Sequence, residues 1–190
     1  MSFDFDILAE ESGMWRECAD LAMHHVDMMF QVVCTMGYPV GLEACLTGME
    51  LPGKQGMTGA DAPKLWKMDP ETVLEYVKGD VTGPLQLAEI AEERKGIVWR
   101  SKRGNPMFCP IEHWFTVEEC LALPLPDTSW MTDPKPREYY YKWVGEADQR
   151  AAQEAYLQES DRVCHEIRQE ARRYEEMRDT IYGPGGRSRR

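Results

Sequence analysis

The amino-acid sequence predicts an α/β fold that is mostly helical, on three observations. Apolar residues recur at the three- and four-residue spacing of a helix through most of the first 95 residues. Two short segments favour strands instead: residues 3–7 alternate apolar and acidic side chains, and residues 96–100 are rich in β-branched and aromatic side chains. Residues 146–182 repeat apolar side chains on a background of alternating charge, which predicts one long helix.

The N-terminal half divides into several predicted helices. Helical spacing covers residues 8–18 and 19–36, and a glycine and a proline end the second of these segments. A further helix is expected over residues 40–49, and residues 52–63 are expected to form a flexible loop because they are rich in glycine and proline. Asp69-Pro70-Glu71 then starts a helix that continues to about residue 95, since proline is favoured in the first helical turn.

In the C-terminal half, short sequence patterns predict individual turns and helices. Lys102-Arg103-Gly104-Asn105 predicts a turn after the strand at residues 96–100. Thr116 and Glu119 have the spacing of a capping box, which predicts a helix over residues 116–123. The surrounding residues are rich in proline and aromatic side chains and contain no recognisable chemical motif.

Tyr76 and Asp80 are the most informative residues for function. They lie four positions apart in a helical segment, so their side chains share one face, one turn apart. An aspartate can hold a divalent metal ion, and a tyrosine hydroxyl one turn earlier can orient the water that attacks a phosphodiester. A core tyrosine beside a surface aspartate has the same spacing, so the pair alone leaves a structural role open.

A second acidic element lies about seventy residues upstream. Phe3-Asp4, followed by an apolar run to Leu8, together with Tyr76-x-x-x-Asp80, resembles the second and third motifs of the DEDD 3′–5′ exonucleases, in their tyrosine branch. The resemblance covers roughly residues 3–95. It extends to three intervening segments, which occur in the order expected for the family: His25–Met29, Gly41–Leu46 and Leu51–Met57.

The resemblance implies part of a ribonuclease H-like fold and a metal-dependent nuclease. Asp4 and Asp80 would bind Mg²⁺ or Mn²⁺, and Tyr76 would position the attacking water. The chain departs from the family in lacking the first motif, Asp-x-Glu on a buried strand, because Asp69-Pro70-Glu71 is a helix start. Taking Asp4 and Asp6 as a first motif would leave no second motif before Tyr76.

The missing motif leaves two functional hypotheses. In the first, the chain is a 3′–5′ exonuclease-like subunit of a nucleic-acid-processing complex, and a protein partner supplies the first motif. Its substrate would be the single-stranded 3′ end of DNA or RNA, with Lys54, Lys102 and Arg103 as candidate contacts to the phosphates. In the second, the chain is a catalytically inactive binding or scaffold subunit that keeps the fold.

This interpretation divides the chain into four parts. Residues 1–98 form the C-terminal part of an exonuclease-like domain, and residues 99–145 form a subdomain rich in proline and aromatic residues. Residues 146–182 form the long charged helix, whose apolar stripe either packs on its own chain or docks on another subunit. Residues 183–190 form a basic tail that is expected to be disordered.

The distribution of charge and of cysteines indicates which partners and which cellular compartment to expect. The net charge is −11, and residues 1–50 contribute −8 of it, with nine acidic residues and one arginine. Such a region binds nucleic acid poorly unless metal ions or a basic partner neutralise it, and a solvated acidic surface is the alternative. The six cysteines contain no Cys-x-x-Cys pair, and no run of eighteen apolar residues occurs, so a cytoplasmic protein without a membrane span is expected.

Overall fold

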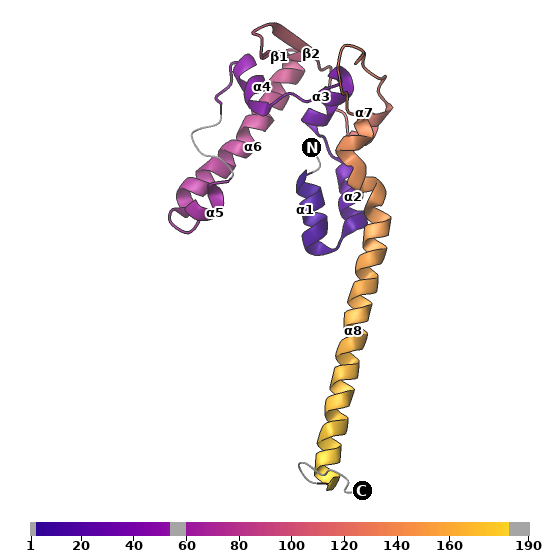
Figure 1. The fold of residues 1–190 in the computed structure, drawn as a ribbon. Coiled ribbons are helices and arrows are strands. Elements are labelled where there is room, and N and C mark those ends of the chain that lie inside the picture. Colours follow the sequence, from indigo (N-terminus) through magenta and orange to yellow (C-terminus); the bar gives the residue numbers. More distant parts are fainter. Residues whose placement is uncertain (1–2, 54–59, 183–190) are drawn as a thin grey trace.

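The computed structural model describes residues 3–53 and 60–182, and the chain in these ranges is mostly helical (Figure 1). The described strands form one hairpin, and the longest connection between described elements that has no masked residue separates α7 from η1. The elements are α1 (Phe3–Ser12), α2 (Trp15–His24), α3 (Met28–Met36), α4 (Leu42–Gly48), α5 (Ala62–Leu65), α6 (Pro70–Glu93), β1 (Gly96–Arg100), β2 (Pro106–Pro110), α7 (Val117–Ala122), the 3-10 helix η1 (Arg137–Tyr141) and α8 (Lys142–Tyr182).

Two buried clusters organise these elements. The first joins α1, α2, α7, η1 and the start of α8, and the second joins α4, α6 and the β1–β2 hairpin. Helix α3 contributes to both, because Phe30 and Cys34 point into the first cluster while Val32 points into the second. The molecule therefore has two helical groups on either side of α3, and α1 and α6 stand apart in Figure 1.

The N-terminal segment is a helix and not the predicted strand. Alternation over residues 3–7 was too short to separate the two structures, because Phe5 and Ala9 also have the four-residue spacing of a helix. Ala9 is fully buried and Phe5 packs against the same cluster. Asp4 and Asp6 lie in the first turn of α1, where the helix dipole favours negative charge.

Two of the predicted helices are interrupted. Gly13 separates α1 from α2 with a φ of 72°, a left-handed conformation that glycine adopts without strain. Asp27 separates α2 from α3 because its side chain caps α3, accepting a hydrogen bond from the Phe30 N–H at 2.9 Å. The helices expected over residues 8–18 and 19–36 are thus three shorter ones.

Most other elements agree with the sequence-based predictions. The helix expected over residues 40–49 is α4, and α6 starts at the expected Asp69-Pro70. The capping box of α7 is present in both directions between Thr116 and Glu119. Strand β1 is confirmed, and it pairs antiparallel with β2, from Gly96 opposite Pro110 to Arg100 opposite Pro106.

The hairpin lies directly on α4. A Cβ atom added at Gly48 would collide with the Val98 carbonyl and the Trp99 Cα, so the last turn of α4 touches the backbone of β1. Only glycine allows this approach. Strand β1 also spans the boundary expected between residues 98 and 99.

A buried arginine ties the proline-rich segment to the helices. Arg137 is 7% exposed, and its guanidinium donates hydrogen bonds to five backbone carbonyls. Four of these carbonyls end α7 and begin the next loop, and the fifth belongs to α3: Cys120, Leu121, Leu123, Pro124 and Cys34. Residues 115–145 therefore pack as an integral part of the first cluster, whereas Cys109 and Ile111 belong to the second.

Helix α8 begins at Lys142, slightly before the predicted start, and runs 41 residues to Tyr182. Its first turns lie on α2, where the Trp15 indole N–H donates to Glu154 at 2.8 Å and Arg16 pairs with Asp148 at 2.5 Å. Beyond these contacts the helix projects away from the body (Figure 1). Within the described residues, no helix combines the length and apolar character needed to cross a membrane.

Candidate functional site

Helix α6 positions both residues of the Tyr76–Asp80 pair. Its N-terminus is fixed by Asp69, whose carboxylate accepts hydrogen bonds from the Thr72 N–H at 3.2 Å and the Thr72 hydroxyl at 2.6 Å. These bonds lower the pKa of Asp69 below its usual value, so the cap stays ionised at neutral pH. The helix then continues for 24 residues, and Tyr76 and Asp80 lie one turn apart on it, as predicted.

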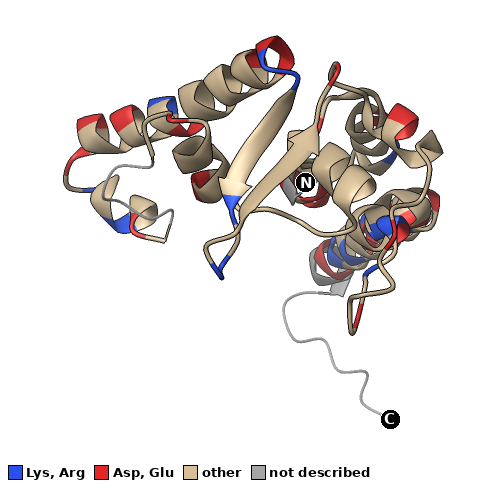
Figure 2. Cartoon of the chain, turned by 90° about the horizontal axis from the view of Figure 1, so that it is seen from above, with Lys and Arg blue, Asp and Glu red and all other residues tan. Residues whose placement is uncertain are grey.

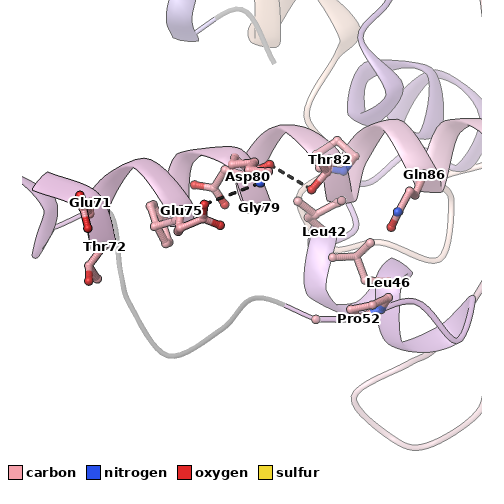
Figure 3. A pocket seen from close by; sticks show the side chains of 15 residues that line it. Leu42, Leu46, Pro52, Glu71, Thr72, Glu75, Gly79, Asp80, Thr82 and Gln86 are labelled. Carbon is pink, nitrogen blue, oxygen red and sulfur yellow. Dashed lines mark hydrogen bonds and ion pairs between the residues drawn. The ribbon is translucent and has the colours of Figure 1, made fainter.

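Tyr76 and Asp80 both line a pocket of about 720 Å³. One wall is the middle of α6, and the opposite wall is Leu42 and Leu46 of α4 with Pro52 from the segment that follows (Figure 3). Both side chains of the pair are half-buried. The pocket is thus apolar on the α4 side and polar on the α6 side, where the two motif residues lie.

Acidic side chains dominate the polar wall. Glu71 and Glu75 line the pocket together with Asp80, and Lys78 is the basic residue among the lining residues. Lys78 pairs with Glu75 at 3.6 Å, which partly neutralises that carboxylate. The negative charge of the α6 wall therefore favours a bound cation, and it would repel a nucleic-acid phosphate that arrived without one. Within residues 3–53 and 60–182, no three His, Cys, Asp or Glu side chains form a group that could hold a metal ion.

Asp4 lies in a different helical group from Asp80. It is exposed in the first turn of α1, and α1 packs on α2, whereas α6 packs on α4, α5 and β1. The structure therefore does not bring together the two aspartates that the sequence predicts as metal ligands. Asp6 faces α8, where its carboxylate forms an ion pair with Arg150 at 3.5 Å.

Two of the three candidate nucleic-acid contacts lie outside the pocket lining. Lys102 and Arg103 are exposed in the turn between β1 and β2, which is visible as the basic tip of the hairpin in Figure 2. Lys54 falls outside the described residues. Charge at the hairpin tip is consistent with a phosphate contact and equally with a solubilising turn.

Sequence reasoning missed the pocket residues around the pair. Glu71, Glu75 and Lys78 line the same pocket from an adjoining side of α6, so the four-residue spacing that links Tyr76 to Asp80 does not select them. Leu42 and Leu46 on the facing helix could not have been assigned, because their position depends on how α4 packs against α6.

A second side of α6 carries apolar residues that are exposed in this chain. Leu74, Val77, Val81 and Leu85 recur at helical spacing, and their exposed fractions are 57%, 48%, 63% and 57%. The buried residues of the helix, Val73, Leu87 and Ala91, occupy a different side. Helix α6 thus has one apolar face in the core of the chain and another that faces outward.

Four of the buried thiols have a raised pKa that disfavours the nucleophilic thiolate. Burial raises the pKa of Cys109 and Cys120 to about 12, and that of Cys34 and Cys45 to about 11. At neutral pH these side chains are protonated, and they serve as small core residues. Nucleophilic catalysis through cysteine therefore has no support at these four positions.

A scan against models of protein families, a search of curated proteins and a search of solved structures each found no significant match to this chain.

Proposed function

We propose that this chain is a 3′–5′ exonuclease-like subunit, with part of a ribonuclease H-like fold, in a complex that processes nucleic acid. The observation that carries the proposal is the placement of Tyr76 and Asp80 together on the polar wall of one pocket. The motif resemblance to the tyrosine branch of the DEDD exonucleases gives this pair its chemical interpretation.

The residues of the pocket suit phosphodiester hydrolysis. The Asp80 carboxylate is a hard oxygen ligand of the kind that Mg²⁺ and Mn²⁺ prefer, and Tyr76 lies one turn away on the same wall. A divalent ion bound there would polarise the phosphate and help to ionise the attacking water. The Tyr76 hydroxyl would hold that water in line with the scissile bond, and Glu71 and Glu75 would add negative charge that attracts the ion.

The site is completed by a partner in this proposal. Two-metal hydrolysis holds the ions about 3.5–4 Å apart, which requires several converging carboxylates. A partner that covers Leu74, Val77, Val81 and Leu85 would bury the outward apolar face of α6. If it also carries the missing Asp-x-Glu on a strand that reaches Asp80, it would supply the first-motif carboxylates.

A scaffold role is the second candidate. The observation that favours it is the separation of Asp4 and Asp80 into different helical groups, together with the lack of a three-residue metal group in the described parts of the chain. In that case Tyr76 and Asp80 support a binding pocket without catalysis. The two candidates differ in whether the assembled complex loses activity when Asp80 is changed.

The test uses the tagged chain recovered with its partners from the cells that produce it. The complex is incubated with 5′-labelled single-stranded DNA or RNA and Mn²⁺, and shortening from the 3′ end is followed on a gel. Asp80→Asn is expected to reduce the rate at least roughly 100-fold and Tyr76→Phe at least roughly tenfold, since loss of a charge-stabilising or water-positioning group costs factors of this size.

Glu89→Gln is the matched control, because Glu89 is exposed on α6 away from the pocket. Its complex is expected to retain the wild-type rate. Shortening that is equally fast with Asp80→Asn would come from a different nuclease in the preparation and would refute the catalytic proposal. An inactive wild-type complex with intact assembly would favour the scaffold role.

A further inference from the structure

The outer part of α8 is a free-standing helix with an uncovered apolar row. Every described side chain from residue 155 to residue 177 is exposed, and over this length the helix projects beyond the body (Figure 1). At 1.5 Å per residue the free segment is about 34 Å long. In proteins most of the stability of a helix comes from packing its apolar face on another surface, and this face is exposed in the described part of the chain.

The apolar row follows a heptad repeat. Assigning position a to Ser160 places the large exposed residues at the alternating a and d positions that form the seam of a coiled coil. The seam consists of Tyr156, Ser160, Val163, Ile167, Glu170, Tyr174 and Met177. Its apolar members are from 41% to 74% exposed. A seam only two residues wide per heptad fits one partner helix rather than a globular surface.

Glu170 determines the direction of a self-pairing. In a parallel, in-register dimer, Glu170 would face Glu170 of the second copy in the seam, and two carboxylates would be desolvated side by side. In an antiparallel dimer, Ser160 pairs with Met177, Val163 with Tyr174 and Ile167 with Glu170 of the second copy. Glu170 then meets an isoleucine, and its carboxylate can reach the edge of the seam.

The flanking charges favour the same arrangement. In the antiparallel register Glu166 and Arg173, both at position g, lie next to each other across the interface, and the symmetry of the dimer produces this contact twice. The parallel register offers Glu166 no basic partner, because the residue across the seam is Ala171. Within one chain, Arg162 forms ion pairs with Glu159 at 2.6 Å and with Glu166 at 4.0 Å.

We propose that residues 160–177 of α8 pair with the same residues of a second copy of the chain as an antiparallel two-stranded coiled coil. The pairing would place the two bodies at opposite ends of a helical rod. The proposal is independent of the exonuclease assignment, since it uses only the outer half of α8.

The first test is the mass of the full chain in solution by sedimentation equilibrium. The expected mass is twice the chain mass of 21.9 kDa. Ile167→Asp places a charge in the seam beside Glu170 of the second copy, and it is expected to raise the dissociation constant at least roughly 100-fold. His165→Asp, on the opposite side of the helix at position f, is the matched control and should remain dimeric, with equal helicity by circular dichroism.

The second test determines direction by disulfide trapping. The background is Cys164→Ser, because Cys164 is exposed whereas the other five cysteines are buried. Ser160→Cys and Met177→Cys are made in separate chains, which are mixed and oxidised. The antiparallel register predicts a crosslink between the two different chains and none within either pure sample. A one-chain mass, or self-crosslinking of Ser160→Cys as in a parallel dimer, would overturn the proposal.

Discussion

Loss of the Arg137 side chain should destabilise the fold strongly, because its buried guanidinium links α3 to the end of α7 and the loop that follows. Its shortest hydrogen bonds reach the carbonyls of Pro124, Leu123 and Cys34, at 2.5, 2.6 and 2.9 Å. Hydrogen bonds to charged groups contribute roughly 1.5 kcal/mol each at the low end, so these three sum to about 4.5 kcal/mol. Two longer bonds, to Leu121 and Cys120 at 3.2 and 3.4 Å, add less.

Arg137→Met keeps the aliphatic stem and removes the charge and all five hydrogen bonds. Because water can reach some of the released carbonyls, we expect the free energy of unfolding to fall by about 4 kcal/mol, slightly less than the sum for the three shortest hydrogen bonds. Arg137→Lys keeps the charge but loses the planar fork, and an intermediate loss of about 2 kcal/mol is expected.

The assay is urea denaturation followed by circular dichroism at 222 nm. With a slope of about 2 kcal/mol/M, the Arg137→Met midpoint should move down by about 2 M. Arg103→Met in the exposed hairpin turn is the control and should change stability by less than about 0.5 kcal/mol. A loss below about 1 kcal/mol for Arg137→Met would refute the view that this side chain ties α3 to the loop after α7.

Two further substitutions test other parts of the structure. Gly48→Ala places a Cβ against the backbone of β1 and is expected to lower the free energy of unfolding by about 2–3 kcal/mol, measured by thermal or urea denaturation. Gly79→Ala is the control, because a Cβ at Gly79 meets open space, and it should be neutral or stabilising. Equal effects of the two changes would show that α4 does not pack on β1. Val81→Lys should leave the stability of the isolated chain within about 0.5 kcal/mol, since Val81 is 63% exposed. The same change should prevent recovery of the active complex, and an active Val81→Lys complex would show that the partner binds elsewhere.

The sequence predicted the local elements whose signals are complete within a few residues. The Thr116–Glu119 capping box, the Asp69-Pro70 helix start and strand β1 were each found as expected, because capping and strand formation depend on adjacent residues. The strand at residues 3–7 was wrong because five alternating residues fit a helix equally well once Ala9 is buried.

The site was predictable only along one helix. Tyr76 and Asp80 lie on the same face because both are on α6, and this follows from helical spacing alone. The position of Asp4 relative to Asp80 depends on how two helical groups are arranged around α3, and motif spacing along the chain contains no such information. The facing wall of the pocket, formed by α4, was unpredictable for the same reason.

Binding of Mn²⁺ at the α6 pocket tests the central claim most directly, because it requires no partner. The amide signals of a uniformly ¹⁵N-labelled chain are recorded during titration with substoichiometric Mn²⁺, whose unpaired electrons broaden nearby resonances. Gly79 and Gly83 line the pocket, and their signals should broaden first in the wild type and remain sharp in Asp80→Asn. Broadening that begins at the acidic α1 and α2 segments, with Gly79 and Gly83 unaffected, would contradict a metal site at Tyr76 and Asp80.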